Sequence, residues 1–164
     1  MNPSARRAAP TDGRYAGRMV VSLRELTKQD FREFLKLEPS PDQQSFVATN
    51  AKSIAEAHFH DDAWFRGIYD DDTPVGFVMI SDIPEKAEYF LWRLMIDQDH
   101  QRKGIGRRAI ELLIDHVRTR PDAEHLWVSY KVGEHSPEGF YQRLGFVPTG
   151  EVDEHGEHLA KIAL

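Results

Sequence analysis

The segment from residue 91 to residue 117 constrains the fold more than any other part of the chain. Residues 91–96 form an apolar run that suits a buried strand, and the polar residues from Asp97 onward end it. From Ile105, apolar residues return at the spacing of an amphipathic helix. The sequence therefore predicts a strand, a loop and a helix in direct succession.

The loop between this strand and this helix has the composition of an anion-binding site. It holds two glycines, Gly104 and Gly106, with four cations beside them. A helix N-terminus has unpaired N–H groups and the positive end of the helix dipole, and glycines let a ligand approach those groups closely. These features favour a polyanion, most simply a pyrophosphate. The four cations are Arg102, Lys103, Arg107 and Arg108.

Two other interpretations of the loop fit less well. Residues 104–109 match the dinucleotide fingerprint G-x-G-x-x-A, which should directly follow its strand. Here residues 97–103 intervene, and the chain after Gly106 is too short for a second nucleotide-binding half. The other interpretation is a helix that merely starts with a charged turn. Four cations at a helix N-terminus oppose its dipole, so we expect an anion to compensate them.

Two motifs of this chain resemble those of the GCN5-related N-acetyltransferases, the GNAT superfamily. Residues 101–106, Gln-Arg-Lys-Gly-Ile-Gly, match the family motif [QR]-x-x-G-x-[GA]. Residues 136–146 resemble the later family block, with its Tyr-x-x-x-Gly-Phe core at 141–146. The resemblance covers about residues 20–164. Within the family, the chain looks most like the spermine/spermidine acetyltransferase branch, in residues 44–47, 53–57, 149–153 and 156–157.

The resemblance implies acetyl-coenzyme A as the cosubstrate. Its pyrophosphate would bind the backbone N–H groups of residues 102–106, and one of the neighbouring cations would meet the remaining phosphate. Its arm carries amides that would pair with the backbone of Met95 and Ile96, as an extra strand does. The coenzyme-binding residues implied in this way are Met95, Ile96, Gln101, Arg102, Lys103, Gly104, Ile105, Gly106 and Arg107.

Acetyl transfer to an amine needs an acid that protonates the leaving thiolate. The resemblance makes Tyr141 this acid. A tyrosine has a pKa near ~10 and a thiol near ~8.5, so the phenol can donate to a thiolate at neutral pH. The chain departs from the family pattern close by, with Glu134 at a common asparagine and Pro137 at a common alanine. Because of these departures, the resemblance does not define how the second block holds the coenzyme.

The base that frees the attacking amine is less clearly marked. We predict Glu88, which lies where the central strand begins. Glu56 and Glu38, on or near the helices expected on the substrate side, are alternatives, as is a water relay. The eight histidines match no metal-ligand framework, so no metal is expected.

Length and composition limit the class of protein to which this chain can belong. A chain of 164 residues is long enough for one domain with a substantial core. The absence of cysteine excludes a disulfide scaffold and a cysteine nucleophile. A net charge of −6 argues against bulk nucleic-acid binding, and no apolar run approaches the roughly 18 residues of a membrane span. Residues 1–18 are predicted to be a disordered tail rather than a transit peptide, and residues 19–164 a single acetyltransferase domain.

The remaining patterns complete an α/β fold in the element order βααβββαβαββ. We expect a mixed, mostly antiparallel central sheet flanked by helices, as the GNAT resemblance implies, with strand 91–96 paired to strand 75–80. The predicted strands are 20–24, 64–69, 75–80, 91–96, 126–130 and a hairpin within 151–164; the helices are 27–37, 50–58, 105–117 and 137–145.

Two classes of function agree with these features. One is an enzyme that moves an acetyl group from acetyl-coenzyme A to an amine, and the other is a non-catalytic sensor of acyl-coenzyme A. For the enzyme, a small cationic amine such as a polyamine is the favoured acceptor, because residues 38–62 and 82–88 are rich in Asp and Glu. A peptide N-terminus, an amino acid and an aminoglycoside are alternatives. The resemblance also implies a homodimer, and we expect a cytoplasmic protein with no nucleic-acid or membrane partner.

Overall fold

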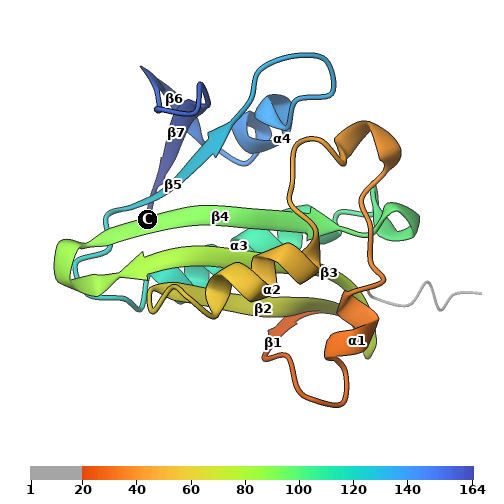
Figure 1. The fold of residues 1–164 in the computed structure, drawn as a ribbon. Coiled ribbons are helices and arrows are strands. Elements are labelled where there is room, and N and C mark those ends of the chain that lie inside the picture. Colours follow the sequence, from red (N-terminus) through yellow and green to blue (C-terminus); the bar gives the residue numbers. More distant parts are fainter. Residues whose placement is uncertain (1–19) are drawn as a thin grey trace, which may run out of the picture.

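The computed structural model describes residues 20–164, so the predicted N-terminal tail lies outside the described residues. Its centre is a seven-stranded sheet with the order β1-β2-β3-β4-β5-β7-β6 (Figure 1). Every pair of neighbours is antiparallel except β4 and β5, which confirms the mixed, mostly antiparallel sheet. The strands are β1 Val21–Arg24, β2 Ala63–Asp70, β3 Thr73–Ile83, β4 Glu88–Ile96, β5 His125–Tyr130, β6 Val147–Val152 and β7 His158–Ala163. The α-helices are α1 Phe31–Phe34, α2 Asn50–Ala57, α3 Ile105–Val117 and α4 Glu138–Arg143, and the 3-10 turns are η1 Pro41–Gln43, η2 Pro84–Lys86 and η3 Gln98–His100.

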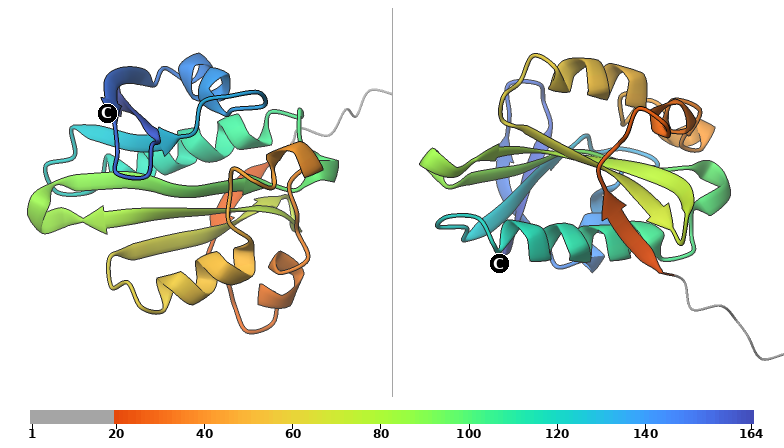
Figure 2. Two further views of the ribbon diagram at one scale, coloured as in Figure 1. Left: turned by 45° about the horizontal axis from the view of Figure 1, so that its top comes forward. Right: turned by 90° about the horizontal axis from the view of Figure 1, so that it is seen from below.

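Helices cover both faces of the sheet. Figure 2 shows α3 on one face and α1 and α2 on the other. The apolar side of α3 is fully buried against the sheet, as its periodicity predicts, and includes Ile110 and Leu113. On the opposite face, Phe77 and Met79 of β3 form a smaller cluster under α2. Because successive side chains of a strand point to opposite faces, β3 is buried on both sides.

Strands β4 and β5 are paired over only part of their length. Their parallel pairing joins Phe90 to Trp127 and Leu91 to Val128, and the two strands then separate (Figure 1). The register between β3 and β4 shifts at the same place, and Trp92 is the extra residue of this bulge. A bulge bends its strand and strengthens the local twist. Among the described residues, β4 from 92 to 96 is therefore paired with β3 alone, and its other edge faces the gap.

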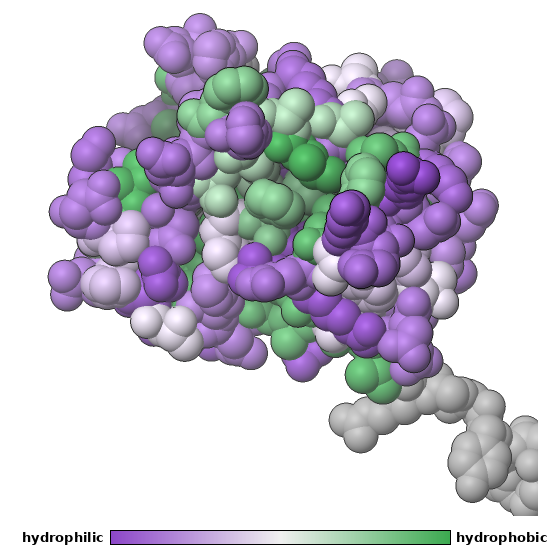
Figure 3. All heavy atoms as spheres, turned by 60° about the horizontal axis from the view of Figure 1, so that its bottom comes forward, coloured by the Kyte–Doolittle hydropathy of each residue, from purple (hydrophilic) through white to green (hydrophobic). Residues whose placement is uncertain are grey.

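The predicted helix 27–37 is wrong in extent. Thr27 opens a turn, in which its carbonyl accepts from the N–H groups of Asp30 and Phe31, and only Phe31–Phe34 are helical. The Asp30 side chain accepts from the Thr27 N–H (2.6 Å), as in a capping box, and the helix ends after Phe34. Phe34 is buried, whereas Leu35 is 43% exposed. On the face seen in Figure 3, apolar side chains lie in the middle and polar ones surround them.

Tyr69 fastens the start of α1 to the sheet. Its hydroxyl donates to Oδ2 of Asp30 (2.8 Å), and its ring packs edge-on against Phe34, with centroids 5.4 Å apart. Burial and the hydrogen bond to Asp30 raise the pKa of Tyr69 to about 12. Burial acts to raise the pKa of Asp30, but hydrogen bonds from Tyr69 and Thr27 outweigh it and hold that pKa below the ordinary value of 3.8.

We expect Tyr69→Phe to lower the free energy of unfolding by about 1 kcal/mol at neutral pH, because Asp30 loses a hydrogen-bond donor. The folded pKa of Asp30 lies below its unfolded value. This stabilisation is therefore complete above the unfolded pKa and is lost as the pH falls through the folded pKa. Urea unfolding at several pH values measures the difference. Tyr130→Phe is the control, because the Tyr130 hydroxyl is buried without a partner. Equal losses in both variants would contradict the expectation.

Candidate active site

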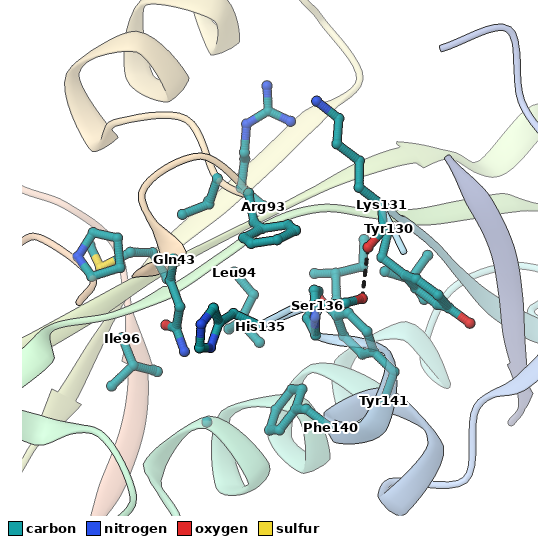
Figure 4. A pocket seen from close by; sticks show the side chains of 18 of the residues that line it. Gln43, Arg93, Leu94, Ile96, Tyr130, Lys131, His135, Ser136, Phe140 and Tyr141 are labelled. Carbon is teal, nitrogen blue, oxygen red and sulfur yellow. Dashed lines mark hydrogen bonds between the residues drawn. The ribbon is translucent and has the colours of Figure 1, made fainter. Parts of the chain in front are cut away.

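A cavity of about 1010 Å³ opens where β4 and β5 separate. Side chains of β4, such as Leu94 and Ile96, line it together with Phe140 and Tyr141 of α4 (Figure 4). One end of the cavity reaches the glycine loop before α3. The other walls come from the segment around η1, from the end of β5, and from the turn between β6 and β7.

Only some of the predicted coenzyme-binding residues of the glycine loop line the cavity. Gly104 has a φ of 83° and directly precedes α3, so the loop turns sharply into the helix. Arg102, Gly104, Gly106 and Arg107 line the cavity. Ile105 does not, because its side chain is buried in the core.

The charges of the predicted loop cations are partly offset by acceptor groups of the protein itself. Arg107 and Arg108 both contact Glu111, at 3.0 and 3.1 Å, one turn further along α3. Their hydrogen bonds lower the pKa of Glu111. Lys103 does not line the cavity, and its Nζ donates to the backbone carbonyl of Asp99 (2.8 Å). Arg102 and Arg107 are thus the loop cations that face the cavity.

Gln101 ties the loop to the end of β4. Its amide donates to the carbonyl of Ile96 and to Oε1 of Gln43, both at 2.9 Å. The Ile96 carbonyl therefore already has a partner, while the β4 edge before it faces the cavity. Met95 is buried, with its side chain in the cluster under α2. The predicted backbone contact with the coenzyme arm at Met95 and Ile96 stays a prediction.

Tyr141 lies on α4 beside the gap between the two strands. Its ring stacks on Tyr130, with centroids 6.0 Å apart, and packs edge-on against Phe146 (5.4 Å). The Tyr141 hydroxyl makes no hydrogen bond with residues 20–164, although the side chain lines the cavity. Burial and the charge of Glu157 raise its pKa well above the ordinary value, so the phenol is protonated at neutral pH. It can therefore donate a proton into the cavity.

A known family model matches the part of the chain that holds the glycine loop, the split between the two parallel strands and the second motif. The model, described as acetyltransferase (GNAT) family, matches residues 20–146. The chain belongs to the GNAT acetyltransferase family. It is an acetyl-coenzyme A-dependent N-acetyltransferase, which decides between the enzyme and sensor classes.

Two named relatives show where this GNAT chain resembles characterised enzymes. It is 27% identical over 148 residues to the spermine/spermidine N(1)-acetyltransferase of Bacillus subtilis strain 168, covering 85% of this chain and 95% of the relative. It is 32% identical over 76 residues to the [ribosomal protein bS18]-alanine N-acetyltransferase of Salmonella typhimurium. This match covers only 46% of this chain and 49% of the relative. The first likeness spans nearly the whole of both proteins.

Solved structures show the same fold. Spermidine N-acetyltransferase from Vibrio cholerae, in complex with CoA and spermine, superimposes with a TM-score of 0.66 at 18% identity, covering 88% of this chain and 94% of the other. An acetyltransferase from Thermus thermophilus superimposes with a TM-score of 0.68 at 20% identity, covering 89% of this chain and 98% of the other. Since the identities are this low, these two likenesses establish the fold alone.

Of the three predicted bases of this GNAT enzyme, only Glu56 lines the cavity. Glu88 is exposed at the first position of β4, where it pairs with Ile83, and does not line the cavity. Glu38 is not among the lining residues either. Glu56 does line the cavity, but Arg93 holds it at 3.0 Å. Glu88 and Glu38 thus lie outside the cavity lining, and the assignment of the base made from sequence stays a prediction.

Sequence reasoning missed one carboxylate of the cavity, Glu157, as a functional residue. It lies in the turn between β6 and β7 and lines the cavity near Tyr141. In sequence it is far from Tyr141 and from the glycine loop, and it shows no periodicity or spacing that marks a function. The sheet order places β7 beside β5, and this brings Glu157 to the site.

Proposed function

We propose that this N-acetyltransferase transfers an acetyl group from acetyl-coenzyme A to the amine of a small cationic acceptor, with a polyamine as the favoured substrate. The observation that carries the proposal is the cavity itself. It joins a cationic glycine loop at one end to Tyr141 and several carboxylates further along. An anionic coenzyme fits the first part, and an ammonium group fits the second. The full-length likeness to a spermine/spermidine acetyltransferase supports the same acceptor class.

In this proposal the residues of the chain hold and orient the cosubstrate. The N–H groups around Gly104 and Gly106 bind its pyrophosphate, and Arg102 and Arg107 add positive charge at the cavity wall. The unpaired edge of β4 at residues 92–96 offers backbone groups to the arm. Tyr141 then stands beside the gap, where its free hydroxyl can protonate the departing thiolate.

The acidic residues that support a cationic acceptor differ from those expected. Of the eight acids in residues 38–62 and 82–88, only Asp42 and Glu56 line the cavity. Four others line a separate hollow of about 770 Å³, together with Arg66, Lys86 and Arg120, which offset much of their charge: Asp61, Asp62, Asp82 and Glu85. Two carboxylates that were not expected, Asp153 and Glu157 of the β6–β7 turn, also line the cavity. The electrostatic argument thus holds with a different set of carboxylates.

None of the helices in residues 20–164 combines the length and the apolar composition that crossing a bilayer requires. A cytoplasmic location and a homodimer stay predictions, and size measurement in solution would test the second.

We expect the KM for spermidine to rise with ionic strength, by about three- to tenfold between about 0.02 M and about 0.3 M salt. Salt screens the attraction between the cavity carboxylates and a polycation. The KM for a neutral amine acceptor should change little under the same conditions. Steady-state assays with spermidine, spermine, lysine, an aminoglycoside and a peptide N-terminus measure the preference. A peptide that exceeds spermidine by about tenfold or more in kcat/KM would overturn the polyamine assignment.

A further inference from the structure

Four carboxylates line the cavity, and they differ in their partners. Asp42 lies 3.4 Å from Nδ1 of His135, and Glu56 pairs with Arg93 at 3.0 Å and with Lys52 at 3.6 Å. Oδ1 of Asp153 accepts the backbone N–H groups of residues 155 and 157, both at 2.9 Å. The fourth carboxylate, Glu157, forms no ion pair with residues 20–164. Within residues 20–164, Asp153 and Glu157 are the cavity carboxylates without an ion pair, and Asp153 is engaged by the backbone of its own turn.

The backbone around Glu157 is fixed by its turn. The Glu157 N–H donates to the Asp153 side chain, and the Asp153 N–H donates to the Glu157 carbonyl, both at 2.9 Å. Gly156 precedes it with a φ of 78°, a conformation that glycine adopts without strain. The Glu157 side chain thus extends from a backbone with little freedom, which suits a group that must hold one position.

The Glu157 side chain is held at the point where the sheet splits. Its Oε2 accepts a hydrogen bond from Oγ of Ser129 (2.6 Å). Ser129 directly follows Val128, the last residue of β5 that pairs with β4. One Oε2 contact leaves most of the acceptor capacity of the carboxylate free. Glu157 and Tyr141 both line this cavity, and the charge of Glu157 helps to raise the pKa of Tyr141.

We propose that Glu157 is the carboxylate that takes the proton from the ammonium group of the acceptor, with Ser129 as the residue that positions it. This inference rests on the proposed function, because it requires an amine acceptor. A protonated amine has no lone pair with which to attack, so its acetylation needs a nearby proton acceptor. Glu157 meets this need in the same cavity as Tyr141.

The protons balance across the two residues. Glu157 takes one proton from the ammonium, and the nitrogen lone pair then forms a bond to the acetyl carbonyl carbon. The carbon–sulfur bond breaks, and the sulfur leaves with that electron pair. Tyr141 gives its proton to the sulfur, and the resulting phenolate takes the second proton from the nitrogen of the new amide. One proton remains on Glu157 and passes to solvent.

The test compares Glu157→Gln with the parent on two acceptors that differ in basicity. The acceptors are 1,3-diaminopropane and its 2,2-difluoro analogue, whose fluorines lower the pKa of both nitrogens. At neutral pH the first reacts from its ammonium form, and the second is largely a free amine. We expect the variant to lose about 10²-fold or more in kcat with the first acceptor and less than about fivefold with the second.

The control is Glu154→Gln, a change in the same turn at a side chain that is 87% exposed and does not line the cavity. It should leave both rates within about twofold of the parent. Equal losses of Glu157→Gln on both acceptors, a change in KM alone, or no loss would each overturn the assignment. The rates of the parent test the proposed function, and the ratio of the variant kcat to the parent kcat tests the role of Glu157. The two can therefore fail separately.

A second variant covers the case in which Glu157→Gln does not fold. Glu157→Ala removes the carboxylate and leaves room for a small one from solution. Added formate should raise the rate of this variant with 1,3-diaminopropane by at least about tenfold, and it should not change the rate of the parent. If formate restores nothing in a folded Glu157→Ala protein, the proton-acceptor role is wrong.

Discussion

Tyr141→Phe should lower kcat by about 10²- to 10⁴-fold, the usual contribution of a positioned general acid. The substitution keeps the ring and removes only the hydroxyl. The ring contacts with Tyr130 and Phe146 should therefore persist, and the hydroxyl makes no hydrogen bond with residues 20–164 whose loss would destabilise the fold. The raised pKa keeps the phenol protonated over the neutral range, so the proton is present when the thiolate leaves. Steady-state assays measure kcat, and calorimetry should show little change in acetyl-coenzyme A affinity.

Tyr130→Phe is the matched control for this experiment. Tyr130 is the stacking neighbour of Tyr141, and its hydroxyl is buried without a partner. It should retain a rate within a fewfold of the parent, because that hydroxyl has no assigned role in proton transfer. If Tyr141→Phe stays within about twofold of the parent, another group or water protonates the thiolate.

Gly106→Glu should weaken acetyl-coenzyme A binding by at least about 100-fold while the protein stays folded. A Cβ at this position would lie 3.4 Å from Phe140 and 3.5 Å from Ile96, which are ordinary contacts, so the backbone can accept a side chain. The carboxylate would then extend toward the cavity, where the pyrophosphate is proposed to bind the helix N-terminus. Titration calorimetry measures the affinity, and thermal unfolding checks the fold.

Two further variants separate charge from bulk at Gly106. Gly106→Ala adds only the Cβ and should bind nearly as well as the parent. Gly106→Gln has the size of the glutamate without its charge and should lie between the two. Unchanged affinity in Gly106→Glu would end the assignment of a phosphate site to this loop.

The elements of this fold could mostly be read from local patterns. The strand at 91–96, the loop and the helix from Ile105 are all present, and the paired strands β3 and β4 are confirmed. Apolar periodicity and glycine placement are local properties, so they predict such elements well. The helix expected at 27–37 is shorter in the structure, Phe31–Phe34, and Asp30 before it is held by Tyr69, a residue far away in sequence.

The sequence by itself determined the glycine loop and the position of Tyr141 in the second block, and its resemblance to the GNAT family implied the mostly antiparallel sheet. Only the tertiary structure decided which carboxylates reach the cavity. Glu88 lies at the far end of β4, whereas Glu157 arrives at the site because β7 pairs with β5. The bulge at Trp92, where β4 leaves β5, is likewise a property of paired strands. Strand order and register depend on contacts between distant segments, and no local pattern of apolar and charged residues records them.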